Sequence, residues 1–271
     1  MVSNENKGTV LITGASAGIG AIYADRLAKR GYDLILVARN GDRLHALAAR
    51  LSDATGRAVE TIVADLIDAA GLARVETVLR TDASITMLVN NAGVGAAGPL
   101  LVSDVDKMTD MIALNVGALT RLTYAVVPGY VARGTGTVVN IASIAVIAPE
   151  ALNGVYGGSK AFVLAFSRSL HHELAERGIR VQAVLPGATA TEFWDIAGPG
   201  LANMPAAILM SAEDMVDAAL AGLDQGELVT IPSLPDAADW AAFEAARQAL
   251  APNLSRTKPA ARYGVALRNA A

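Results

Sequence analysis

The chain has 271 residues, a net charge of −4 and no cysteine, which suits one large α/β domain in a reducing, cytoplasmic setting and excludes disulfides and thiolate metal sites. Without a basic stripe, binding to nucleic acid is not expected. No run of eighteen apolar residues occurs, and residues 1–7 lack a signal-peptide pattern, so we expect neither a membrane span nor a leader. We also expect no metal site, because the adjacent His171 and His172 would diverge on a helix and His45 lies far away in sequence.

Short β-rich apolar runs alternate with longer helical patterns along most of the chain. The expected strands are residues 9–13, 33–38, 58–64, 86–90, 135–142, 180–185 and 228–231. Between the second and third runs, Leu44, Leu47, Ala48 and Leu51 have the spacing of a helix with one buried stripe. This alternation predicts a Rossmann-type, doubly wound α/β fold, with a seven-stranded, mostly parallel sheet and helices on both faces.

The organisation along the chain predicts one Rossmann-fold domain over residues 1–271, with a core at about 8–235. We interpret the apolar stretch at about 190–210 as a segment that covers a substrate. Its Gly198-Pro199-Gly200 sequence suits either a lid or a simple surface loop. Residues from about 250 to 271 form a C-terminal extension that contains basic residues and no acidic one.

Ligands of such a sheet bind outside the carboxyl ends of its strands. The most informative residues of the chain directly follow expected strands. In chain order they are the glycine-rich residues 14–20, Arg39, Asp65, residues 90–93, Ser143 and the pair Pro186-Gly187. All six positions are expected at the same edge of the sheet, where the strands end. Together they predict a ligand site at this edge.

Together these residues resemble the classical short-chain dehydrogenase/reductase family over about residues 8–235. The matching pieces are T-G-A-S-A-G-I-G at residues 13–20, Asp65, Asn90-Asn91-Ala92-Gly93, Asn115, Ser143, Tyr156-x-x-x-Lys160 and Pro186-Gly187. The combination is specific, whereas the glycine loop or the Tyr-Lys pair alone is a weak signal. The resemblance implies an oxidoreductase that transfers a hydride between NADP(H) and a ketone, an aldehyde or a secondary alcohol.

The glycines, spaced G-x-x-x-G-x-G, lack the Cβ atoms that would keep a pyrophosphate away from the backbone, and the following helix would offer free N–H groups. An NAD site usually has a carboxylate at the end of the second strand, where this chain has Ala38. Arg39 follows it, and its guanidinium would suit a 2′-phosphate with Ser16 as a second donor. We therefore expect NADP(H) rather than NAD(H). The cofactor-binding residues that the resemblance implies are Gly14, Ser16, Gly18, Ile19, Gly20, Arg39, Asp65, Leu66, Asn91, Ala92, Gly93, Tyr156, Lys160, Pro186, Gly187, Thr189 and Thr191.

Within this set, the resemblance gives some residues particular roles. Asp65 and the backbone of Leu66 would hold the adenine, and Asn91 with Gly93 would line its ribose. Thr191, in preference to Thr189, would hold the nicotinamide carboxamide. For the residues after the strands, a structural turn without a ligand is the competing interpretation.

The resemblance also implies that Ser143, Tyr156, Lys160 and Asn115 are catalytic. Tyr156 would donate the proton during reduction, and Lys160, one helical turn away, would lower its pKa from about 10. Ser143 would orient the substrate oxygen. Asn115, within an apolar helical stretch, would interrupt that helix and hold a water leading from Lys160.

Structural roles compete with these assignments. They are an amphipathic surface pair for Tyr156 and Lys160, a loop cap for Ser143 and a polar misfit for Asn115. Gly157 and Gly158 disfavour a helix, and we interpret them as the sign of a close neighbour or cofactor.

The segments expected around the substrate, at 94–100, 144–153 and 192–210, contain many apolar residues and few charges. They predict an apolar, uncharged small-molecule carbonyl or alcohol as the substrate. Within the family, the alternatives are a 3-oxoacyl-thioester reductase or a hydroxysteroid-type reductase. Family members commonly assemble through long helices, and the alanine-rich pattern near 162–174 permits a homodimer or homotetramer.

Two alternatives belong to other functional classes. Gly14 to Gly18 also spell G-x-S-x-G, the nucleophile elbow of a serine hydrolase, with Ser16 as the nucleophile. That elbow needs an oxyanion-hole donor from an earlier strand loop, for which the few preceding residues leave little room. The second alternative is a non-catalytic dinucleotide-sensing protein, which would not need the Ser-Tyr-Lys set that this chain has.

Overall fold

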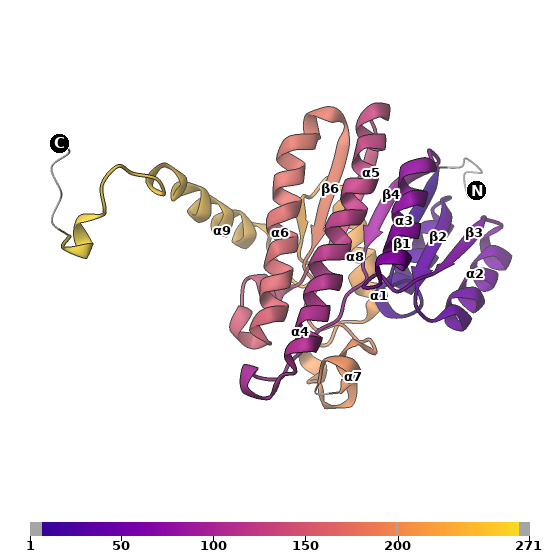
Figure 1. The fold of residues 1–271 in the computed structure, drawn as a ribbon, viewed down its shortest axis with the longest axis horizontal. Coiled ribbons are helices and arrows are strands. Elements are labelled where there is room, and N and C mark those ends of the chain that lie inside the picture. The colour runs from indigo at the N-terminus through magenta and orange to yellow at the C-terminus, as the bar shows by residue number, and fades with distance from the viewer. Residues whose placement is uncertain (1–6, 199, 266–271) are drawn as a thin grey trace. The chain divides into compact units, whose positions relative to one another are not determined.

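The computed structural model describes residues 7–198 and 200–265, and Figure 1 shows its fold. The chain divides into two units, Met1–Ser233 and Leu234–Ala271, close to the predicted end of the core at about 235. The second unit contains helix α9, Ala237–Ala249, so it begins earlier than the predicted extension. None of the residues of α9 is buried, so this helix contributes no side chain to the hydrophobic core. Residues 1–6, Pro199 and residues 266–271 of the C-terminal extension, on which parts of the sequence predictions rest, lie outside the described residues.

The first unit is built around one sheet. Its strands are β1 (Thr9–Thr13), β2 (Asp33–Ala38), β3 (Val59–Val63), β4 (Ile85–Asn90), β5 (Gly136–Ile141), β6 (Ile179–Val184) and β7 (Val229–Thr230). Their order is β3-β2-β1-β4-β5-β6-β7, and each pair of neighbours is parallel. The predicted doubly wound fold is confirmed, with strand ends within one residue of the expected ones. The sheet is wholly parallel, where a mostly parallel one was expected.

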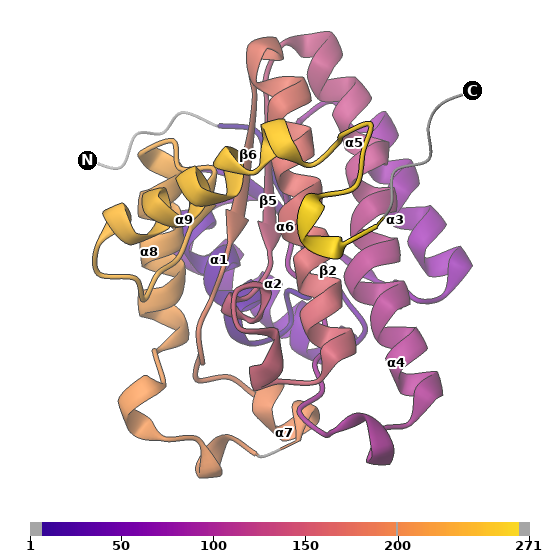
Figure 2. The ribbon, with the colours of Figure 1, turned by 90° about the vertical axis from the view of Figure 1, so that its left-hand side faces the viewer.

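Helices cover both faces of the sheet, as Figure 2 shows. One layer comprises α1 (Gly18–Lys29), α2 (Gly41–Thr55) and α8 (Ala212–Asp224), and the other comprises α3 (Ala69–Thr81), α5 (Leu119–Arg133) and α6 (Gly154–Leu174). Strand β1 alternates between the layers, because Val10 and Ile12 belong to the first core cluster and Leu11 to the second. The predicted stripe of α2 is confirmed, since all four of its apolar residues are buried.

A π-helical turn at Ala113–Ala118 joins α4 (Val105–Ile112) to α5. The resulting helical stretch, Val105–Arg133, is the only one in the described part of the chain that is long and apolar enough to cross a membrane. A core helix passes the same test, and here Leu122, Val126 and Tyr130 pack into the second core cluster. The expectation that the chain does not enter a membrane stays a prediction.

Glu76 on α3 links the helices of the second layer. Its side chain is 3% exposed and accepts hydrogen bonds from Arg80, at 2.7 Å, and from Arg121 of α5. Burial raises the pKa of Glu76, but the hydrogen bonds from the two arginines outweigh this effect and leave the pKa below its usual value. The ionised carboxylate therefore stabilises the contact between α3 and α5.

We expect Glu76→Gln to lower the free energy of unfolding at pH 7 by about 1–2 kcal/mol, because two charge-assisted hydrogen bonds become weaker. A depressed pKa in the folded state stabilises the protein above the unfolded-state pKa. The difference from wild type should therefore shrink as the pH falls below about 4.3. Urea unfolding at several pH values measures it, with the exposed Glu176→Gln as the matched control. Equal stability of wild type and Glu76→Gln at pH 7 would contradict this role.

Candidate active site

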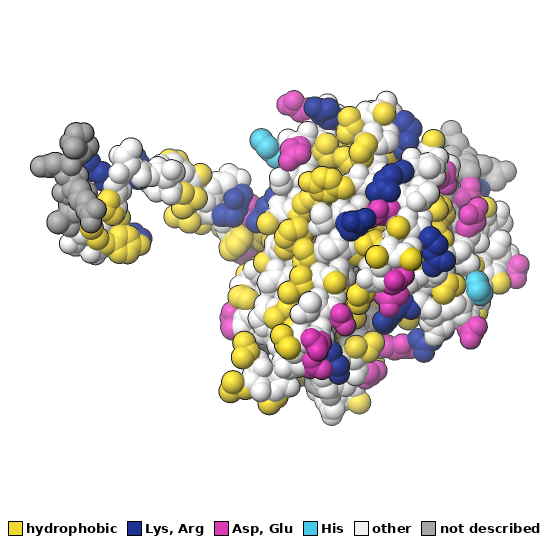
Figure 3. Space-filling view, viewed as in Figure 1, with side chains coloured by type: hydrophobic (Ala, Val, Ile, Leu, Met, Phe, Trp, Pro, Cys, Tyr) yellow, Lys and Arg dark blue, Asp and Glu magenta, His cyan; other side chains and the backbone are white. Residues whose placement is uncertain are grey.

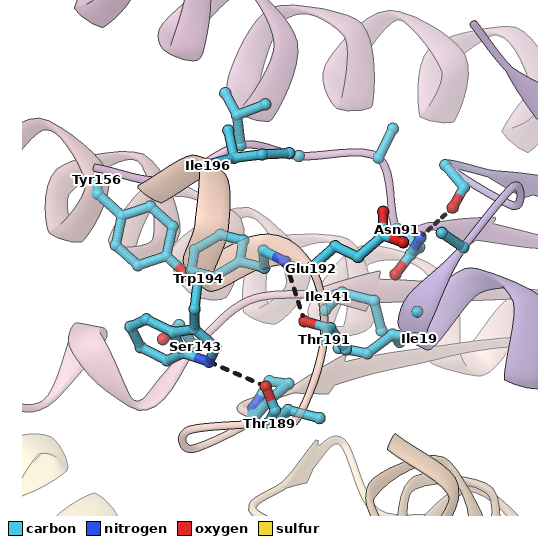
Figure 4. Close-up of a pocket in the computed structure, with 18 of the residues that line it drawn as sticks. Ile19, Asn91, Ile141, Ser143, Tyr156, Thr189, Thr191, Glu192, Trp194 and Ile196 are labelled. Carbon is cyan, nitrogen blue, oxygen red and sulfur yellow. Dashed lines mark hydrogen bonds between the residues drawn. The ribbon is translucent and has the colours of Figure 1, made fainter. Parts of the chain in front are cut away.

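A cleft of about 1370 Å³ opens at the carboxyl edge of the sheet, and Figure 4 shows part of its lining. Of the predicted site residues, all except Asn115 and Gly20 line this cleft. Tyr156 and Ser143 lie at one end of it, whereas Ile19 and Asn91 lie at the other. Residues that are far apart in the sequence are thus brought together as predicted.

The glycine loop after β1 is shaped by close backbone contacts. Gly14 and Gly18 have positive φ angles of 67° and 53°. A Cβ on Gly14 would lie 2.8 Å from Nδ2 of Asn91, and a Cβ on Gly20 would lie 2.3 Å from the Gly14 carbonyl oxygen. Gly20 therefore serves the packing of α1 against the loop, which explains why it does not line the cleft.

Asn91 holds the glycine loop in place. Its Nδ2 donates to the carbonyl oxygens of Thr13 and Gly14, at 2.9 and 3.1 Å. Helix α1 begins at Gly18 without a side-chain cap and without an acidic residue in its first turn. Its first N–H groups and its positive dipole end are therefore available to an anion at the cleft.

Basic residues stand at the rim beyond β2. Arg39 is two-thirds exposed, and its NH1 lies 3.8 Å from Oδ2 of Asp65, after β3. NH1 of Arg43 lies 2.7 Å from Oε2 of Glu192, which connects α2 to the residue just before helix α7 (Phe193–Ala197). Arg43 is not part of any of the sequence motifs. Its position in the first turn of the helix that follows Arg39 was the available signal for a second cation at this rim.

Tyr156 and Lys160 lie in the first two turns of α6, which Asn153 caps with its side chain. Both are buried, and Nζ of Lys160 lies 5.8 Å from the centroid of the Tyr156 ring. Nζ also donates to the carbonyl oxygen of Ile141, at 2.9 Å. The alternative of a solvent-exposed surface pair is therefore wrong, because neither side chain reaches the outer face of the helix.

Ser143 follows β5 and performs two tasks. Its Oγ accepts from the backbone N–H of Ala145 at 3.1 Å, so it does cap a short turn, as its structural interpretation predicted. It also hydrogen-bonds to the Tyr156 phenol. The Ser143 hydroxyl, the Tyr156 phenol and the Lys160 ammonium thus share one wall of the cleft.

The electrostatics differ from the prediction at one point. Burial raises the pKa of Tyr156, and the hydrogen bond from Ser143 opposes this rise only in part. The predicted lowering by Lys160 is not found, because that ammonium is itself buried and donates to Ile141. Burial lowers the pKa of Lys160 to about 8. This arrangement keeps the Tyr156 phenol protonated at neutral pH. It also brings the pKa of the Lys160 ammonium close to neutral pH.

Asn115 lies within the π-helical turn, so the predicted interruption of the helix is confirmed. Its Oδ1 accepts from the Val94 N–H at 3.0 Å, and its Nδ2 donates to the Val94 carbonyl oxygen and to Oγ of Ser159. The missing side chain of Gly93 gives Asn115 this access, since a Cβ there would lie 3.1 Å from Oδ1. The side chain thus fixes the strand-end loop, and a water beside it stays a prediction.

The two threonines after Pro186-Gly187 have different surroundings. Thr189 is buried and donates to the Gly187 carbonyl oxygen at 3.1 Å. Thr191 is only partly buried and faces the glycine loop, where a Cβ on Gly18 would lie 3.1 Å from its Cγ2. Its Oγ1 accepts from the N–H of Phe193 at 3.4 Å. The preference for Thr191 over Thr189 stays a prediction, and it agrees with this exposure.

Two sequence interpretations fail locally. A Cβ on Gly158 would meet nothing within 4 Å, and one on Gly157 would make only ordinary contact with Pro149. Among the described residues these glycines thus have no unusually close neighbour, and a cofactor beside them stays a prediction. Among the described residues that line the cleft there is no histidine, so Ser16 lacks the base that a serine hydrolase needs.

Comparisons with known proteins agree with this geometry. A family model described as short chain dehydrogenase matches residues 8–199. A very-long-chain 3-oxoacyl-CoA reductase of Anas platyrhynchos is 38% identical over 201 residues, which cover 70% of this chain and 62% of the relative. The chain thus spans about three fifths of the length of that curated relative.

Two solved structures are similar over nearly the whole chain. One is a short-chain dehydrogenase from Sphingobium yanoikuyae in complex with NADPH, with 51% identity, a TM-score of 0.91 and coverage of 94% of this chain and 100% of that one. The other is a bulky-bulky ketone specific alcohol dehydrogenase from Comamonas testosteroni, with 43% identity, a TM-score of 0.88 and coverage of 96% and 99%. With the matched family model and the Ser143, Tyr156 and Lys160 wall, they establish that this chain belongs to the short-chain dehydrogenase family.

Proposed function

We propose that the protein is an NADP(H)-dependent oxidoreductase that interconverts an apolar ketone or aldehyde and the corresponding alcohol. The observation that carries this proposal is the shared wall of Ser143, Tyr156 and Lys160, at the end of a cleft that continues to the glycine loop. A non-catalytic dinucleotide sensor would not need a buried ammonium beside a buried phenol, because burying a charge is costly.

The residues present fit a phosphorylated dinucleotide. The glycine loop has no room for side chains at Gly14 and Gly20, and the uncapped start of α1 suits a pyrophosphate. Arg39 is exposed at the rim, where a guanidinium would bind a 2′-phosphate. The NADPH in the structure of the Sphingobium relative supports the same choice. Asp65 and Leu66 would hold the adenine, and Thr191 the carboxamide.

When bound, NADPH supplies the hydride. The chain's own residues stabilise the negative charge that develops on the carbonyl oxygen of the substrate. Tyr156 donates its proton to this oxygen while the Ser143 hydroxyl donates a hydrogen bond that holds it. Lys160, one helical turn away and with a pKa lowered to about 8, can then supply a proton that restores the phenol near neutral pH. Asn115 keeps the loop at Val94 in place beside this wall.

The substrate we propose is an uncharged ketone with apolar groups on both sides of the carbonyl. Around the reacting end, the lining is mostly apolar, with Val94, Leu152, Trp194 and Met204 among its residues. The bulky-bulky ketone specificity of the Comamonas relative supports this choice. The 3-oxoacyl-CoA reductase relative makes an acyl thioester the alternative. Rates of NADPH oxidation with ketones and with a 3-oxoacyl thioester distinguish the two.

Tyr156→Phe should lower kcat by roughly 10²–10⁴-fold, because the ring remains but its transferable proton is lost. Quenching of protein fluorescence by NADPH should still report binding. Tyr32→Phe, a partly buried phenol outside the cleft, is the matched control and should keep full activity. Turnover of Tyr156→Phe at the wild-type rate would show that another group donates the proton.

Arg39→Ala should raise the KM for NADPH by about 10–100-fold, because one or two charge-assisted hydrogen bonds to the 2′-phosphate are lost. The KM for NADH should change little, since NADH has no such phosphate. Initial rates with both cofactors give the two values, and the exposed Arg177→Ala serves as the control. Equal changes for NADPH and NADH would remove the assignment.

We also propose that the enzyme is a cytoplasmic homo-oligomer that assembles through α5 and α6. Hydrophobic side chains gather over these two helices in Figure 3. Tyr124 is 69% exposed and Phe162 is 38% exposed, and Phe166 stacks with both rings at centroid distances of 6.3 and 5.6 Å. An aromatic patch of this kind is typical of a surface that a partner covers.

Tyr124→Glu should convert the oligomer into monomers, because a carboxylate would be buried without a partner at the interface. Light scattering of the purified protein measures the mass. Ala49→Glu, on the exposed side of α2, is the matched control and should leave the mass unchanged. A wild-type protein that is already monomeric would refute the assembly without affecting the proposed chemistry.

A further inference from the structure

Phe193, the first residue of α7, packs against the reacting end of the cleft. Its ring centroid lies 5.9 Å from that of Tyr156, with the two planes tilted by 51°. It also makes a T-shaped contact with Trp194, at a centroid distance of 5.3 Å. Trp194 is buried and its Nε1 donates to the Thr189 carbonyl oxygen at 2.9 Å, which holds this neighbour in place. Phe193 thus packs against both the anchored Trp194 and the ring of Tyr156.

The tip of the Phe193 ring occupies the place where Gly95 lacks a side chain. A Cβ on Gly95 would lie 2.1 Å from Cζ and 2.6 Å from Cε2 of this ring. Such distances are far inside van der Waals contact, so only glycine allows the ring to lie there. Gly95 is not among the glycines with positive φ, and its backbone would accept an alanine. The missing methyl group, rather than an unusual conformation, is what the contact requires.

The loop around Gly95 is tied down on both sides. The N–H of Ala97 donates to the carbonyl oxygen of Ala197 at 2.8 Å, and the N–H of Asn153 donates to the carbonyl oxygen of Ala96 at 3.2 Å. These bonds join the loop to the end of α7 and to the start of the catalytic helix. When the contact is crowded, the element that can move is therefore the Phe193 ring, which turns about two side-chain torsions.

We infer that Phe193, seated over Gly95, is the wall that determines how large a substrate group can lie beside Tyr156. The inference rests on the proposed function and adds a specificity residue to it. Apolar walls of this kind discriminate between groups by size, at about 10–200-fold per misfitting methylene. Removing the ring would open the space next to the phenol. A methyl group on Gly95 would displace the Phe193 ring into the cleft. The displaced ring would narrow the same space.

The test is a double-mutant cycle with Phe193→Ala, Gly95→Ala and the combination of both. The substrates are 2-butanone, acetophenone and valerophenone, in which first one and then the other arm of the ketone grows. The measured quantity is kcat/KM with NADPH for each ketone, together with NADPH binding and the free energy of unfolding for each variant. Gly98→Ala, in the same loop, is the matched control, because its added Cβ would meet no atom closer than 3.8 Å.

We expect Phe193→Ala to raise the ratio of kcat/KM for the larger ketone over the smaller one by about tenfold for one of the two growing arms. Gly95→Ala should lower the same ratio and destabilise the protein, but only while Phe193 is present. If Phe193→Ala does not fold, Phe193→Leu replaces it, since leucine keeps the packing on Trp194 and lacks the ring tip over Gly95.

Unchanged ratios in an active Phe193→Ala enzyme would overturn this inference, as would equal effects of Gly95→Ala with and without the ring. A wild-type protein that binds NADPH but reduces none of the three ketones would instead contradict the proposed function. Because the unfolding measurements do not need turnover, they test the seating of Phe193 over Gly95 in either case.

Discussion

Parallel strand pairing is the constraint on which the site depends. It brings the carboxyl ends of seven strands to one edge, where the ladders stop and the loops must turn toward the helices. At the switch between β1 and β4, Asn91 ties the loop after β4 to the glycine loop after β1. The same edge receives Ser143 from β5 and faces the start of α6. One topological rule thus gathers the groups proposed to bind phosphate and to donate a proton.

The reacting end maintains two polar groups in an unfavourable environment. Burial lowers the pKa of Lys160 to about 8 and raises the pKa of the Tyr156 phenol. Each is held by a specific neighbour, the ammonium by the Ile141 carbonyl and the phenol by Ser143. Because apolar residues of similar size often stabilise a fold as well as buried polar ones, the burial of this pair supports its proposed role in proton transfer.

The local patterns of the sequence were sufficient for the architecture. Seven apolar runs predicted seven strands because a buried parallel strand is both short and continuously apolar. The stripe from Leu44 to Leu51 predicted the buried face of α2 for the same kind of reason. The rim residues were also predictable, because in this fold they directly follow strand ends.

Properties that depend on distant neighbours could not be read from the sequence. The raised pKa of Tyr156 follows from its burial among residues that are distant in the sequence. The contact between Gly95 and Phe193 joins two loops that no local pattern relates. Likewise, α9 has an ordinary helical sequence, and only the structure shows that it buries none of its residues.

The ion pair between Arg43 and Glu192 connects the start of α2, at the rim of the cleft, to the residue just before α7. Both side chains are at least half exposed, so dissolved ions reach them freely. Electrostatic attraction between exposed charges fades over about 10 Å at 0.1 M ionic strength and over shorter distances in stronger salt. The Arg43–Glu192 ion pair is therefore weaker at high ionic strength than at low ionic strength. The apolar packing around Trp194, in contrast, hardly responds to dissolved ions.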